Sequence, residues 1–80
     1  MSEEIRVDRV LDTSGLSCPM PVVKTAKEIS QVPVGGILKV IATDPGSLSD
    51  IPAWAKSQGH EVVKVEKESG RFVFYVKRTK

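Results

Sequence analysis

The sequence predicts an α+β fold, a two-layer sandwich in which two helices pack on one face of a four-stranded mixed β-sheet. Segments rich in β-branched residues alternate with two segments of helical periodicity, and this alternation indicates strands separated by helices. Two further strand-like segments at the C-terminal end are separated only by Ser69-Gly70, which is typical of a hairpin. The predicted order is therefore βαβαββ.

The first half of this pattern comprises a strand and a helix. Apolar and charged residues alternate over residues 5–11, which predicts the first strand. Val22, Ala26 and Ile29 recur at helical spacing, so we expect a helix over residues 19–31. The following Val32-Pro33-Val34-Gly35-Gly36 segment ends that helix and turns the chain.

The next segment predicts a strand over residues 37–43, a turn, and a second helix that runs to Gln58. Gly59 is expected to end the helix in the left-handed conformation. Pro52 leaves two alternatives for the helix start. It fits the first turn if Ser49 is the N-cap, and it kinks the helix if Ser47 is.

Residues 60–68 and 71–78 are predicted to form the closing hairpin. Because side chains alternate along a strand, Phe72, Phe74 and Val76 share one face, which we assign to the core. Val73, Tyr75 and Lys77 are then expected to face solvent or a partner.

Size and composition limit the possible functions. The eighty residues are expected to form one domain, 1–80, of ordinary folded composition, with 40% hydrophobic and 28% charged residues. A net charge of +2 is too small to indicate nucleic-acid binding. One cysteine and one histidine make neither an intramolecular disulfide nor a structural zinc site. The N-terminal residues show no apolar signal core, and a reduced thiol then predicts a cytoplasmic protein.

Cys18, the only cysteine, is the leading candidate for chemistry. It precedes two prolines, in Cys18-Pro19-Met20-Pro21, where the first helix is expected to begin. With Cys18 as N-cap, Pro19 occupies the first helical position and Pro21 the third, and the Met20 N–H points at the sulfur. The helix dipole would favour the thiolate, the nucleophilic form. The alternative is an inert buried cysteine, which the surrounding Gly, Ser and Pro residues disfavour.

The segment from Leu11 to Pro21 resembles the L-D-x-x-G-x-x-C-P-x-P signature of the TusA/SirA-like sulfur-carrier family, with Asp12, Gly15 and Cys18 at the matching positions. Gly35, the Ala42-Thr43-Asp44-Pro45 turn and Asp50-Ile51-Pro52 extend the resemblance over most of the chain. The resemblance implies that Cys18 carries persulfide sulfur.

The family resemblance also implies protein partners. It implies a sulfur-donor protein, either a cysteine desulfurase or a rhodanese, and an acceptor protein with a reactive cysteine. The sulfur would serve tRNA thiolation, molybdenum-cofactor synthesis or another sulfur-trafficking pathway. No metal or organic cofactor is expected. Membrane association is not expected, and direct nucleic-acid binding is disfavoured.

Charged residues near the expected site are candidates for partner docking. Lys24 and Lys27 follow Cys18 on the first helix, where they could attract an acidic partner or form only a solvated face. Asp44 and Asp50 could receive partners, although an aspartate before a turn is more often a local backbone acceptor.

Two other functions remain alternatives to the sulfur carrier. One is a non-enzymatic protein- or RNA-interaction module in which Tyr75, Lys77 and Arg78 line the open sheet face. The other is a thiol-based redox sensor that uses Cys18.

Overall fold

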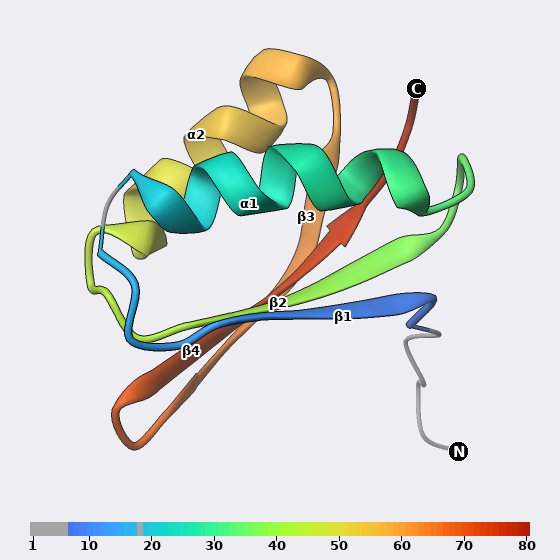
Figure 1. Ribbon diagram of the computed structural model, residues 1–80. Coiled ribbons are helices and arrows are strands. Elements are labelled where there is room, and N and C mark those ends of the chain that lie inside the picture. Colours follow the sequence, from blue (N-terminus) through green and yellow to red (C-terminus); the bar gives the residue numbers. More distant parts are fainter. Residues whose placement is uncertain (1–6, 18) are drawn as a thin grey trace.

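The computed structural model describes residues 7–17 and 19–80 and has the predicted α+β architecture. Its elements, in chain order, are strand β1 (Arg9–Thr13), helix α1 (Met20–Glu28), the 3-10 helix η1 (Ile29–Gln31), strand β2 (Ile37–Ala42), helix α2 (Ser47–Gln58), strand β3 (Glu61–Glu68) and strand β4 (Arg71–Lys77). Both α-helices cover the same face of the sheet (Figure 1), which confirms the predicted two layers.

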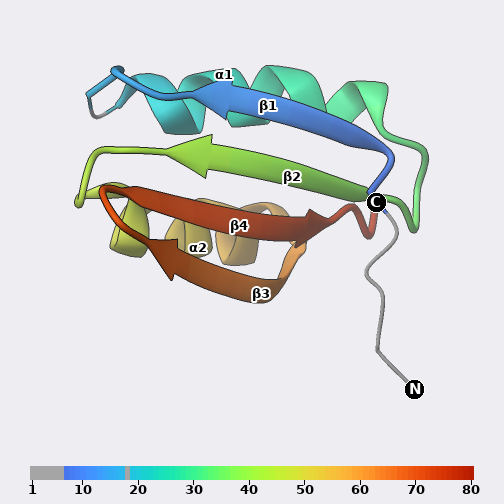
Figure 2. The ribbon, with the colours of Figure 1, turned by 90° about the horizontal axis from the view of Figure 1, so that it is seen from below.

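The four strands form one mixed sheet in the order β1-β2-β4-β3 (Figure 2). Strands β1 and β2 are parallel, with Leu11 opposite Val40 in the register, and α1 makes the crossover between them. Strand β4 pairs antiparallel with both β2 and β3. The parallel pair places the C-terminal ends of β1 and β2 at the same edge of the sheet. The loops that leave these two strands are therefore neighbours.

The hydrophobic core lies between the sheet and the two helices. Its largest fully buried side chains include Phe74, Leu38 and Ile51, contributed by β4, β2 and α2. The predicted core face of β4 is confirmed, because Phe74 and Val76 are buried and Phe72 packs against the same cluster.

We expected Val73 to face solvent or a partner, and the solvent-facing alternative is wrong. Val73 lies on the sheet face away from the helices, yet only 3% of it is exposed. It sits on a central strand directly between Ile41 on one side and Glu66 on the other. Flanking side chains on both neighbouring strands therefore surround a small residue and bury it. Of the other two residues assigned to this face, Tyr75 is half-buried and Lys77 is exposed.

The first strand is shifted from its predicted position. We expected it over residues 5–11, whereas β1 spans Arg9–Thr13, and residues 5 and 6 lie outside the part of the chain that the structure describes. Asp8 precedes the strand as a bend. Its carboxylate accepts the Ile37 N–H at 2.9 Å, and its own N–H donates to the Ile37 carbonyl at 2.9 Å. Pairing with β2 therefore sets the strand's position, and the local alternation of residue types does not.

The start of helix α2 differs from both predicted alternatives. The helix begins at Ser47, with Gly46 as N-cap, so the prediction of an N-cap at Ser47 or Ser49 is wrong. Pro52 consequently lies inside the helix, where it removes one backbone donor. The other end is as predicted, because Gly59 has a φ of +82°. None of the described helices is long and apolar enough to cross a membrane.

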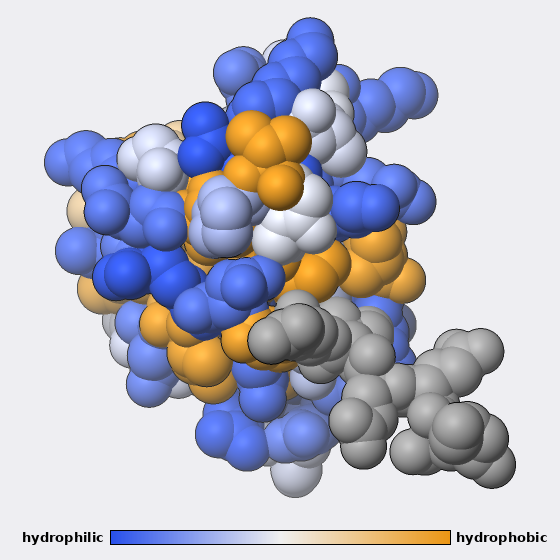
Figure 3. All heavy atoms as spheres, turned by 90° about the vertical axis from the view of Figure 1, so that its right-hand side faces the viewer, coloured by the Kyte–Doolittle hydropathy of each residue, from blue (hydrophilic) through white to orange (hydrophobic). Residues whose placement is uncertain are grey.

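The end of the molecule shown in Figure 3 is the one where the chain turns from η1 into β2. Hydrophobic residues on this face are interspersed with hydrophilic ones. The loop between β1 and α1 lies at the opposite end (Figure 1).

Candidate functional site

The candidate site is built around the loop that connects β1 to α1. Cys18 lies in this loop but outside the described residues, so the predictions for its exposure and surroundings stay predictions. Residues 14–17 and Pro19 are described on either side of it. The loop runs beside the 43–46 turn, at the edge where β1 and β2 both end (Figure 1).

Several hydrogen bonds hold the described part of this loop. The Thr13 hydroxyl donates to the Ile41 carbonyl at 2.6 Å, which fastens the end of β1 to β2. The Ser14 N–H donates to the Asp12 carboxylate at 2.9 Å, and the Leu16 N–H donates to the Thr13 carbonyl at 3.1 Å. Further along, the Gly15 N–H donates to the Thr43 hydroxyl at 2.8 Å. The chain is therefore tethered three residues before Cys18.

Asp12 and Gly15, both expected to support the site, have local roles in this loop. Hydrogen bonds from the Ser14 hydroxyl and then the Ser14 backbone N–H hold the pKa of Asp12 below its ordinary value, so it stays charged. Gly15 has a φ of +82°, and an added Cβ would meet nothing within 4 Å. Glycine is required there because of the backbone conformation and not because of space.

Helix α1 begins one residue later than predicted. Pro19, with φ −96° and ψ 11°, is the N-cap, so Met20 is the first helical residue and Pro21 the second. The Met20 N–H donates to the Ser17 carbonyl at 2.9 Å. Our prediction of Cys18 as the N-cap is therefore wrong. The contact that we expected between the Met20 N–H and the Cys18 sulfur falls on a residue outside the described part of the chain. In the tight turn from Ser17 to Met20, the Met20 N–H is bonded to the Ser17 carbonyl.

The candidate docking residues lie on the two helices and the turn between β2 and α2. Lys24 and Lys27 are exposed on α1. Asp44 acts in the turn itself, since its carbonyl accepts the Ser47 N–H at 2.9 Å and its carboxylate lies 3.4 Å from the Gly46 N–H. Asp50 is half-buried in the first turn of α2. The prediction of docking at these four residues stays untested.

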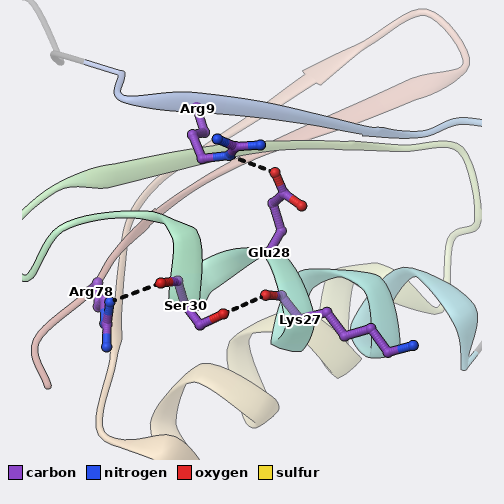
Figure 4. A network of polar contacts seen from close by, with 5 residues as sticks. All are labelled: Arg9, Lys27, Glu28, Ser30 and Arg78. Carbon is purple, nitrogen blue, oxygen red and sulfur yellow. Dashed lines mark hydrogen bonds and ion pairs between the residues drawn. The ribbon is translucent and has the colours of Figure 1, made fainter.

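Of the three residues of the RNA-binding alternative, Arg78 is held on the helix side of the sheet and not on the open face. The Arg78 side chain donates to the Ser30 carbonyl at 3.3 Å (Figure 4). It also donates to the Val32 carbonyl at 2.7 Å, just after η1. In the same network, Arg9 pairs with Glu28 at 2.6 Å.

Tyr75 is also engaged within the protein. Its hydroxyl donates to Glu66 at 3.2 Å, and burial together with this carboxylate raises its pKa. The Lys39 ammonium lies 5.9 Å from the centre of its ring. Among residues 7–17 and 19–80, no group of three or more His, Cys, Asp or Glu side chains is placed to hold a metal ion.

Comparison with known proteins identifies the family. A family profile described as "Sulfurtransferase TusA" matches residues 9–78. The chain belongs to the TusA family. It is 43% identical over 72 residues to the sulfur carrier protein TusA of Allochromatium vinosum, covering 90% of this chain and 95% of that one.

Two further matches bear on length and fold. A putative sulfur carrier protein of Aquifex aeolicus is 50% identical over 76 residues, which are 95% of this chain but 39% of that longer protein. The crystal structure of a SirA-like protein from Desulfitobacterium hafniense superposes with a TM-score of 0.77 at 22% identity, over 90% of this chain and 99% of that one. This last likeness supports the TusA fold alone.

The TusA match spans the whole candidate site, from β1 through the Cys18 loop to the turn after β2. Sequence reasoning proposed Cys18, Asp12 and Gly15 as site residues, a prediction that stays untested, and it did not include Thr43, the hydrogen-bond partner of Gly15. One signal was present. Thr43 directly follows a strand predicted to be central, and the ends of parallel strands meet at one edge of the sheet.

Proposed function

We propose that this TusA-family chain accepts sulfane sulfur on Cys18 and passes it to the thiol of an acceptor protein. The observation that carries the proposal is that the chain's single cysteine lies in a loop that is hydrogen-bonded, through Gly15, to the residue directly after β2. The donor is a cysteine desulfurase or a rhodanese. The acceptor serves tRNA thiolation, molybdenum-cofactor synthesis or another sulfur-trafficking pathway. A cytoplasmic location belongs to the same proposal.

Each half of the transfer is a thiol–disulfide-type exchange. The Cys18 thiolate attacks the outer sulfur of the donor persulfide, the donor's S–S bond breaks, and the donor cysteine leaves as a thiolate. Cys18 now carries the persulfide. An acceptor thiolate then attacks the outer sulfur, the new S–S bond at Cys18 breaks, and the Cys18 thiolate leaves. No electron is gained or lost overall, so the exchange needs no external oxidant.

Two features of the chain favour this chemistry. First, Cys18 directly precedes the N-cap of α1, where the partial positive charge of the helix favours an anionic sulfur. Second, the sequence contains no other cysteine. A loaded Cys18 persulfide therefore cannot collapse into an intramolecular disulfide, and it persists until an acceptor arrives.

Partner docking is proposed at the charged residues around this loop. The exposed Lys24 and Lys27 extend along α1 from the Cys18 end. They would attract an acidic surface and raise the association rate, an effect that salt screens. Asp44 and Asp50 lie at the start of α2, at the same end of the molecule, and would receive basic groups of a partner.

The proposal is tested by following sulfur through a complete transfer. The protein is incubated with a cysteine desulfurase and cysteine labelled with radioactive sulfur, and then chased with an unlabelled thiol acceptor. The label should appear on the wild-type chain, leave during the chase, and be absent from Cys18→Ser. Failure of the wild type to load from both a desulfurase and a rhodanese, with its thiol shown to be free, would contradict the proposal.

A further inference from the structure

Among the hydrogen bonds of the described residues, the one to Thr43 ties the Cys18 loop to the end of the neighbouring strand β2. Thr43 directly follows β2 and is half-buried. Its hydroxyl accepts the Gly15 N–H at 2.8 Å, although the two residues are 28 positions apart. The bonds from Ser14 and Leu16 end on Asp12 and Thr13, within the same β1–loop segment. They shape the loop without fixing it to the rest of the molecule.

We propose that Thr43 is a positioning residue for Cys18, and this inference rests on the proposed function. Only Leu16 and Ser17 separate the tethered Gly15 from Cys18. After Cys18 the chain is fixed again, because the Val23 N–H donates to the Pro19 carbonyl at 3.0 Å and so begins α1. Helix α1 therefore holds the chain after Cys18, and the bond to the Thr43 hydroxyl holds the chain before it.

The hydroxyl also accepts this bond without a full charge. A carboxylate at the same place would accept the same N–H, but it would bring a negative charge beside the loop. A nearby negative charge disfavours an anionic sulfur, whether thiolate or persulfide, and raises its pKa. Thr43 therefore holds the loop at no electrostatic cost to the reactive form of Cys18.

Three substitutions separate these roles. Thr43→Val keeps the shape and removes the acceptor, Thr43→Ser keeps the hydroxyl, and Thr43→Asp keeps an acceptor but adds charge. The measurement is the rate of Cys18 alkylation by iodoacetamide as a function of pH, together with the rate of sulfur loading from a desulfurase. Thr79→Val is the matched control, because it removes a hydroxyl that donates to the Gly59 carbonyl, away from the loop.

We expect Thr43→Val to slow both reactions by about threefold to tenfold, the range of one neutral hydrogen bond. Thr43→Ser should stay within about twofold of the wild type. Thr43→Asp should move the alkylation midpoint to higher pH, and Thr79→Val should leave the midpoint and rate unchanged.

The proposal is overturned if Thr43→Val shows the wild-type alkylation profile, or if Thr79→Val slows alkylation equally. Should Thr43→Val fail to fold, the Ser and Asp variants decide. A wild-type midpoint in Thr43→Asp, or a loss of rate in Thr43→Ser as large as that expected for Val, overturns it. Alkylation does not depend on sulfur transfer. Failure of the wild type to load sulfur therefore counts against the proposed function and leaves the Thr43 test intact.

Discussion

Replacement of Gly15 by alanine should weaken the fold and slow the chemistry of Cys18 together. Gly15 has a φ of +82°, and its surroundings leave space for a methyl group. The cost is therefore that of a left-handed backbone at a residue with a Cβ, about 1–2 kcal/mol. Reduced freedom of the unfolded chain offsets about 0.4–1 kcal/mol of this. The net loss in the free energy of unfolding is about 1 kcal/mol.

Gly70→Ala provides a matched control at a glycine of the β3–β4 turn, which β2 separates from β1 in the sheet. Gly70 has a φ of +74° in the β3–β4 turn, also with nothing within 4 Å of an added Cβ. Both variants should lose about 1 kcal/mol, which is about fivefold in the folding equilibrium and about 4–8 °C in Tm for a domain of this size. Asparagine tolerates this conformation better, so Gly15→Asn should recover part of the loss.

The two variants should differ in the reactivity of Cys18. Urea denaturation followed by far-UV circular dichroism gives the stabilities, and iodoacetamide alkylation in native buffer gives the reactivity. We expect slower alkylation in Gly15→Ala and the wild-type rate in Gly70→Ala. Equal alkylation rates in the two variants would refute the link between loop conformation and Cys18. An undiminished stability in Gly15→Ala would refute the backbone argument itself.

Three further predictions address the core, the docking face and the response to pH. Leu38→Ala, at a fully buried position, should cost about 2–5 kcal/mol in urea denaturation, whereas Val34→Ala, at a position 64% exposed, should change stability by less than about 0.5 kcal/mol. Lys24→Glu combined with Lys27→Glu should slow sulfur loading at low salt, and the deficit should shrink at high salt; an unchanged low-salt rate would leave these lysines as a solvated face. Burial, with help from nearby positive charges, lowers the pKa of His60 below 6.5, so the unfolded chain binds more protons in this range. The free energy of unfolding should fall as pH is lowered from about 6.5 toward the folded pKa and then level off, and His60→Gln should lack this component.

Glycines in the sequence correctly predicted where a helix ends and where a hairpin turns. Gly59 ends α2 and Gly70 lies in the turn of the β3–β4 hairpin, both with positive φ, because glycine marks such positions without reference to the rest of the fold. Features set by distant pairing were missed. Strand β1 is displaced because its position depends on β2, and Val73 is buried because both neighbouring strands flank it.

In the candidate site, too, local sequence patterns predicted some features, and contacts between distant residues set the others. The motif around Cys18 indicates a candidate for the chemistry, since the residue types and their spacing are contained in one short segment; that assignment stays a prediction. The start of α1 was wrong by one residue, because a turn at Pro19 competes with the helix for the Met20 N–H. The bond between Gly15 and Thr43 joins residues 28 positions apart. Only the register of the parallel strands brings them together, and no local pattern encodes it.

The central claim is that Cys18 carries the sulfur, and intact-protein mass spectrometry tests it most directly. After incubation with a cysteine desulfurase and cysteine, and removal of both, the wild-type chain should gain the mass of one sulfur atom. Fragmentation should assign that mass to residue 18, and a thiol reductant should remove it. Folded Cys18→Ser should gain nothing. An added sulfur that persists in Cys18→Ser, or a wild-type chain that stays unloaded with its thiol free, would contradict the account.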